Sequence, residues 1–100
     1  MSIYISIDPG INKCGVLLAD IQSGEVIEAG IASLNKFSGL VSLWNENYNV
    51  SKIIIGDGTN CKYVANQLKR NNFLNINYVN ERGSTLRARF RYWEIWPPNY

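Results

Sequence analysis

Histidine is absent from this 100-residue chain, and cysteine occurs only twice, at Cys14 and Cys61. Without histidine, Ser-His-Asp catalysis and histidine general-base chemistry are excluded, and most zinc sites are excluded with them. The two cysteines match no zinc-binding spacing. Both flank the acidic strand ends described below, where a redox role is conceivable, but we interpret them as two small buried hydrophobic residues.

The chain also lacks any long apolar run and any basic leader. Its first residues, MSIYISIDPG, carry no basic segment followed by a hydrophobic stretch, so no signal peptide is expected. No segment approaches membrane-spanning length. With 46% hydrophobic residues over 100 positions, the composition predicts one globular domain spanning 1–100. We expect a cytoplasmic protein with no membrane partner.

The net charge of +2 is small, but it is unevenly distributed. Residues 1–57 carry six acids and three lysines, whereas residues 62–100 carry seven bases and two acids. A basic half beside an acidic half suits phosphate attraction next to a carboxylate-lined site. Solvated helix faces explain the same asymmetry equally well.

Period-two alternation predicts a strand over residues 3–7, ending in Asp8 and broken by Pro-Gly. Residues 15–20 and 25–33 read as two further strands joined by a Gln-Ser-Gly turn, which predicts an antiparallel meander. Residues 52–56 form a short apolar run typical of a strand buried on both faces. Residues 75–80 alternate again and predict a fifth strand.

Helical spacing of apolar residues appears in three places. Residues 37–47 predict one helix, and a second begins after a cap at Thr59 or Asn60 and stops near residues 71–72. A third, capped by Ser84 or Thr85, ends at Pro97-Pro98. The order is therefore β-β-β-α-β-α-β-α, an α/β fold in which the strands separated by helices should add in parallel.

Three acids follow the ends of predicted strands. Asp8 closes the first strand, Asp57 the fourth, and Glu81 follows the fifth. Ligands of open sheets bind beyond the carboxyl ends of parallel strands, and adjacent strands lie about 4.8 Å apart. Carboxylates this close repel unless a cation lies between them, and Mg²⁺ or Mn²⁺ prefers such oxygen ligands. The plainer alternative is turn formation, at which Asp-Pro-Gly and Asp-Gly are both effective.

Two segments resemble a known family. Residues 7–16, Ile-Asp-Pro-Gly followed by Lys-Cys-Gly-Val, are similar to the opening motif of the RuvC/YqgF group of resolvase-like nucleases in the ribonuclease H superfamily. Residues 80–85, Asn-Glu-Arg-Gly-Ser-Thr, resemble the second motif of the YqgF branch. The resemblance implies a ribonuclease H-like sheet ordered 3-2-1-4-5. It also implies metal-dependent phosphodiester cleavage of structured nucleic acid, either four-way junction DNA or a ribosomal RNA precursor.

By this resemblance Asp8 matches the first-strand metal aspartate, Glu81 the second-motif glutamate, and Asp57 a fourth-strand carboxylate that the YqgF branch commonly lacks. Two departures stand out. Asn80 replaces an aspartate, and the chain has no aspartate after Asp57. Either the chain is truncated relative to its relatives, or its carboxylate set is incomplete.

Basic residues beside these acids are the expected phosphate contacts. Arg82 could bind phosphate bidentately or pair with Glu81. Further expected nucleic-acid contacts are Lys13, Arg87, Arg89 and Arg91.

The sequence therefore predicts a Mg²⁺- or Mn²⁺-dependent endonuclease-like domain with Asp8, Asp57 and Glu81 as catalytic metal ligands. The alternatives are a nucleic-acid-binding module without a complete site, or a dimerisation domain. A homodimer is one expected state, because Tyr92, Trp96 and Tyr100 are hard to bury together and an exposed aromatic segment suggests a partner surface.

Overall fold

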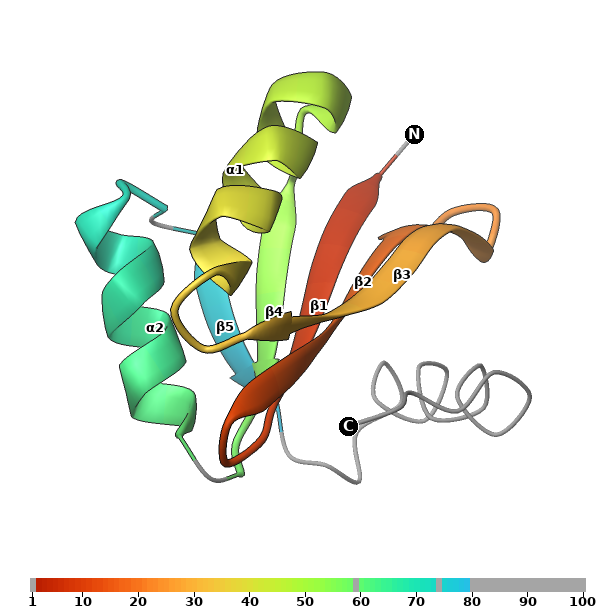
Figure 1. Ribbon diagram of the computed structural model, residues 1–100. Helices are drawn as coiled ribbons and strands as arrows, with labels where there is room; N and C mark the ends of the chain where they lie inside the picture. The colour runs from red at the N-terminus through yellow and green to blue at the C-terminus, as the bar shows by residue number, and fades with distance from the viewer. Residues whose placement is uncertain (1, 59, 74, 80–100) are drawn as a thin grey trace.

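A computed structural model describes residues 2–58, 60–73 and 75–79 of the chain. Its elements, in chain order, are β1 (Ile3–Pro9), β2 (Lys13–Asp20), β3 (Glu25–Ser33), α1 (Phe37–Tyr48), β4 (Lys52–Gly56), α2 (Cys61–Arg70) and β5 (Ile76–Val79). The five strands form one sheet in the order β3-β2-β1-β4-β5 (Figure 1). This confirms the predicted α/β fold and its 3-2-1-4-5 order. The third predicted helix lies outside the described residues.

Strand pairing follows the predicted directions. The β1–β2 and β2–β3 pairs are antiparallel, whereas β1–β4 and β4–β5 are parallel. Parallel pairing of β1 with β4 brings their carboxyl ends to the same edge of the sheet. Strand β2 begins at Lys13, two residues earlier than the pattern predicts, because the turn before it is short and closed by a backbone hydrogen bond.

Both described helices cover one face of the sheet (Figure 1). That face carries alternate residues of each strand, such as Ile5 and Ile7 in β1 and Ile55 in β4, all fully buried. Phe37 from α1 and Leu68 from α2 pack into the same cluster, since each lies on the apolar stripe of its helix. This core fixes the strand ends that carry the candidate site.

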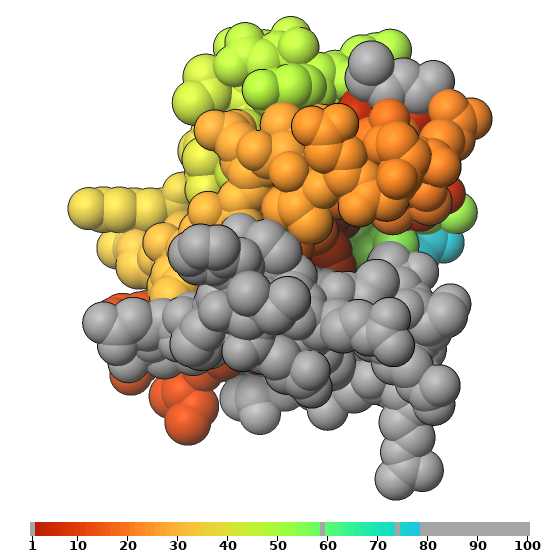
Figure 2. All heavy atoms as spheres, turned by 90° about the vertical axis from the view of Figure 1, so that its right-hand side faces the viewer, coloured from red at the N-terminus to blue at the C-terminus, as the bar shows by residue number. Residues whose placement is uncertain are grey.

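The other face of the sheet is buried at its centre as well. Leu17 of β2 and Ile54 of β4 are 6% and 4% exposed, and the hydroxyl-bearing Ser6 of β1 is 3% exposed. Burial on both faces explains why residues 52–56 are almost wholly apolar. At the edge of the sheet, β3 lies beside α1 in the space-filling view (Figure 2).

Neither described helix could cross a membrane, because α1 has 12 residues and α2 has 10, well short of the length that a bilayer requires.

Candidate functional site

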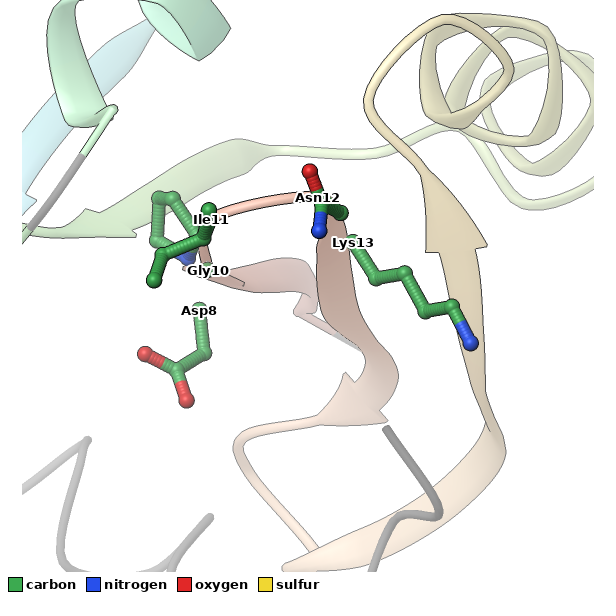
Figure 3. A pocket seen from close by; sticks show the side chains of 6 residues that line it. Asp8, Gly10, Ile11, Asn12 and Lys13 are labelled. Atoms are coloured by element: carbon green, nitrogen blue, oxygen red, sulfur yellow. The ribbon is translucent and has the colours of Figure 1, made fainter.

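Asp8 lies near the carboxyl end of β1 and is half-buried. It borders a surface pocket of about 520 Å³ whose lining comes from one continuous stretch, Asp8, Pro9, Gly10, Ile11, Asn12 and Lys13. In the close view the Asp8 carboxylate projects below the turn that follows it (Figure 3). The end of β1 and its turn therefore form the candidate site.

Glycine stands next to Asp8 on both neighbouring strands. Gly15 of β2 is its direct partner, and directly paired residues of antiparallel strands share a face. On β4, Gly56 follows Ile55, the partner of Ile7. The two positions directly beside Asp8 therefore carry no side chain, which suits the close approach of an ion or a phosphate group.

The turn after Asp8 requires glycine for steric reasons. The Gly10 backbone N–H donates a hydrogen bond to the carbonyl oxygen of Lys13 at 2.8 Å. A Cβ atom on residue 10 would lie 2.7 Å from that same oxygen, closer than real side chains approach. Glycine at position 10 is therefore required by the turn itself.

Asp57 lies at the same edge of the sheet but not on the face of Asp8. Side chains alternate along a strand, so Asp8 shares a face with Ser6, and Gly56 continues that face on β4. Asp57 follows in a bend and is exposed. By the same alternation it lies on the opposite face, the one that carries Ile55, whose side chain is in the core under the helices. It does not line the pocket beside Asp8.

Lys13 is the one predicted phosphate contact within the described residues. It is exposed at the start of β2 and lines the pocket, but its side chain extends away from Asp8 (Figure 3). The other predicted site residues, Glu81, Arg82, Arg87, Arg89 and Arg91, lie outside the described residues. Within 2–58, 60–73 and 75–79, no group of three or more His, Cys, Asp or Glu side chains could hold a metal ion.

Cys14 lies directly under the turn, paired with Pro9, and is fully buried. Burial raises the pKa of its thiol from 9.0 to about 11. A backbone hydrogen bond at Gly10 offsets part of this rise, and the negative charge of Asp8 adds to it. Cys61 is half-buried at the start of α2, and no disulfide links the two. Cys14 thus behaves as the small hydrophobic core residue that the sequence predicts.

Asn60 is the residue of the site that sequence reasoning missed. The sequence predicts it, or Thr59, as a helix cap, but the Asn60 side chain makes no capping hydrogen bond to α2. Its amide nitrogen instead donates to the carbonyl oxygens of Gly10 and Ile11, at 2.8 and 3.2 Å. Thr59 lies outside the described residues. A contact across 50 positions leaves no local signal, because it depends on β1 and β4 being neighbours.

No family model matches this sequence, and no curated protein matches it. Among solved structures, the Ppx/GppA phosphatase of Aquifex aeolicus in its type II variant superposes with a TM-score of 0.50 at 13% identity, covering 80% of this chain and 36% of that one. Pelota of Archaeoglobus fulgidus gives a TM-score of 0.57 at 17% identity, covering 91% of this chain and 31% of that one.

The chain spans about a third of the length of these two neighbours. At 13% and 17% identity the likeness shows the fold alone. Together with the sheet order, it defines the chain as a domain of the ribonuclease H-like and actin-like ATPase type of fold. The resolvase-type nuclease stays a prediction.

Proposed function

We propose that this domain holds a divalent cation, Mg²⁺ or Mn²⁺, at Asp8 and uses it to hydrolyse phosphodiesters of a structured nucleic acid. The observation that supports the proposal most directly is the placement of Asp8. Its carboxylate stands at a strand end, beside a pocket of about 520 Å³, with glycine next to it on both neighbouring strands. Glycine at these two positions would let a phosphate group come close to the Asp8 carboxylate.

The carboxylate of Asp8 suits a hard cation. Carboxylate oxygens are ligands that Mg²⁺ prefers, and it usually retains several waters and takes substrate phosphate oxygens as further ligands. In this proposal Glu81 adds a carboxylate to the one that Asp8 supplies, whereas Asp57, on the other face of the strand end, would have to turn toward Asp8 to share the ion. When bound, the cation would act as a Lewis acid and lower the pKa of a coordinated water.

The residues of the chain itself have distinct tasks in this proposal. Asp8 would determine the position of the cation. Gly10 allows the tight turn in which its N–H donates to the carbonyl oxygen of Lys13. The predicted basic residues, Lys13 and the arginines at 82, 87, 89 and 91, neutralise the phosphate backbone and orient it. They need no contact with the reacting atoms.

A second candidate function is nucleic-acid binding without hydrolysis. The position of Asp57 favours it, because the alternation of β4 turns residue 57 away from the face of Asp8. A single carboxylate anchors a cation weakly, and two-metal hydrolysis requires two ions about 3.5–4 Å apart. In this case the Asp8 pocket would serve cation-assisted phosphate binding only.

Cleavage assays on four-way junction DNA and on precursor ribosomal RNA, each with Mg²⁺ and with Mn²⁺, test the proposal. We expect cation-dependent cleavage of one substrate, and an Asp8→Asn variant that loses about 10²–10³-fold in rate, as removal of one electrostatic contact typically costs. Asp20→Asn is the matched control, since Asp20 ends β2 at the opposite edge of the sheet.

The outcomes separate the candidates. Salt-sensitive binding without cleavage would support the binding module over the nuclease. If the wild-type chain neither cleaves nor binds these substrates, both nucleic-acid functions are excluded and a dimerisation domain is left.

A further inference from the structure

Asn60 departs from the ordinary behaviour of a residue that begins a helix. A capping asparagine usually has extended backbone angles, and its side-chain oxygen accepts a hydrogen bond from the first turn. Asn60 has a left-handed backbone, with φ of 63° and ψ of 11°, and makes no side-chain cap. Helix α2 therefore starts without the stabilisation that this residue type could give it. Local rules of this kind are most often broken where a residue serves a functional site.

The Asn60 side chain reaches the turn after Asp8. Its amide nitrogen donates to the carbonyl oxygens of two consecutive residues, Gly10 at 2.8 Å and Ile11 at 3.2 Å. An asparagine amide has two N–H donors, so both bonds can form at once. The contact joins the segment after β4, which carries Asp57, to the turn that follows β1, the strand that ends with Asp8 and Pro9.

The turn depends on such hydrogen bonds because little packing holds it. Ile11 is 76% exposed, and Asn12 is exposed as well. Apart from the Gly10 to Lys13 bond within the turn, a backbone bond from the Leu34 N–H to the Asn12 carbonyl at 3.2 Å ties it to the segment before α1. Among the described residues, the two hydrogen bonds of the Asn60 side chain thus connect this turn to the start of α2.

Fixing these carbonyls also orients the peptide groups. In a trans peptide the C=O and N–H point in opposite directions. With the Gly10 and Ile11 carbonyls held toward Asn60, the N–H groups of Ile11 and Asn12 point away from it. The Asn60 amide therefore sets the direction of the Gly10–Ile11 and Ile11–Asn12 peptide planes in the turn after β1.

We propose that Asn60 is a positioning residue, whose side-chain amide holds the Gly10–Ile11 turn in the conformation that Asp8 needs to bind a cation. This inference rests on the proposed function. Asn60 does not touch the cation itself. It acts through the turn, as outer hydrogen-bond partners do when they orient the ligands of metal sites.

The test compares three residues at position 60. Glycine adopts the left-handed backbone without strain, so Asn60→Gly removes only the amide. Asn60→Asp keeps the shape and is an equally good cap, but its ionised carboxylate cannot donate and would repel the two carbonyls. The matched control is Asn72→Gly, because Asn72 also has a positive φ, of 67°, and lies at the far end of α2.

The readout is Mn²⁺ affinity, measured by calorimetry with thermal unfolding of the same samples. We expect Asn60→Gly to weaken Mn²⁺ binding about tenfold, Asn60→Asp to weaken it further, and Asn72→Gly to stay within about twofold of wild type, all with similar melting temperatures. A purely capping role predicts the opposite for Asn60→Asp, which would then match wild type. That result would overturn the inference.

Hydrogen exchange of the Gly10 N–H separates this inference from the proposed function. If Asn60 holds the turn, Asn60→Gly speeds exchange of that N–H about tenfold or more relative to Asn72→Gly, whether or not a cation binds. Wild-type protein that binds no Mn²⁺ would refute the proposed function. Unchanged Gly10 exchange in Asn60→Gly would refute the positioning role of Asn60.

Discussion

Strand β2 has a turn at each end, and an aspartate stands beside each turn. At one end Asp20 accepts hydrogen bonds from the backbone N–H groups of Ser2 and Gln22, at 3.2 and 3.1 Å. At the other end Asp8 borders a pocket and faces Gly15 across the strand pair. An acid at a strand end is therefore a candidate ligand only where the fold gives it suitable surroundings.

The pKa of Asp20 shows what its surroundings do. Desolvation tends to raise that pKa, but the hydrogen bonds from Ser2, Gln22 and Ser23, together with the positive N-terminus, outweigh it and lower the pKa below its ordinary 3.8. The Asp20 carboxylate thus stabilises the turn that follows it, as the turn-forming alternative predicts for acids at strand ends. For Asp8, the glycines on both sides suit an incoming ligand instead.

The largest expected difference between the two turns is in thiol reactivity. Cys14, buried under the Asp8 turn, has a pKa of about 11 against an ordinary 9.0. Near neutral pH its thiolate fraction is therefore about a hundredfold lower than that of an unperturbed thiol. In a Cys61→Ala background, we expect Cys14 to react with a disulfide reagent at least about a hundredfold more slowly than an exposed cysteine.

The exposed reference comes from the other turn, in a Ser23→Cys variant that also carries Cys14→Ala and Cys61→Ala, since Ser23 is exposed. Comparable labelling rates for the two cysteines would mean that the Asp8 turn opens readily, which contradicts the packed arrangement described above.

A second difference concerns the glycines of the two turns. Gly10→Ala forces a Cβ within 2.7 Å of a backbone oxygen, and we expect it to lower the free energy of unfolding by about 1–3 kcal/mol. Gly24→Ala places alanine at a φ of 76° and should cost about 1–2 kcal/mol. Only Gly10→Ala should also weaken Mn²⁺ binding, since only residue 10 belongs to the Asp8 turn.

Denaturant unfolding and Mn²⁺ calorimetry measure the two effects separately. Gly39→Ala in α1 is the control, because nothing lies within 4 Å of its new Cβ and alanine should stabilise the helix by about 0.5–1 kcal/mol. Equal losses of Mn²⁺ affinity in the Gly10 and Gly24 variants would assign the effect to stability alone.

The smallest expected effect is the acid sensitivity of Asp20. Because its folded pKa lies below 3.8, its hydrogen bonds stabilise the protein fully above that pH, and this contribution is lost as the pH falls through the folded pKa. Between about pH 5 and pH 2, wild type should therefore lose more stability than Asp20→Asn. Urea midpoints across this range measure it, and parallel curves for the two proteins would show that the turn does not use the carboxylate.

Much of the fold could be predicted from local patterns, because each element has its own signal. The alternation before Asp8 and the apolar run at 52–56 are set by neighbouring residues, and the strand order follows from the family resemblance. The site was less predictable. The alternation of Ile53 and Ile55 indicates the face on which Asp57 lies, whereas its position at a strand end indicates only the edge of the sheet. Asn60 was not predictable, since its partners lie 50 and 49 residues away.

Mn²⁺-induced broadening of backbone N–H signals by NMR shows directly whether a cation binds at Asp8, because a paramagnetic ion broadens the signals of the residues around it. We predict saturable broadening centred on Gly10, Gly15 and Gly56, lost in Asp8→Asn, with the Gln22 and Gly24 signals at the other turn unaffected. Broadening that is absent, or centred on the Asp20 turn, would contradict a cation site at Asp8.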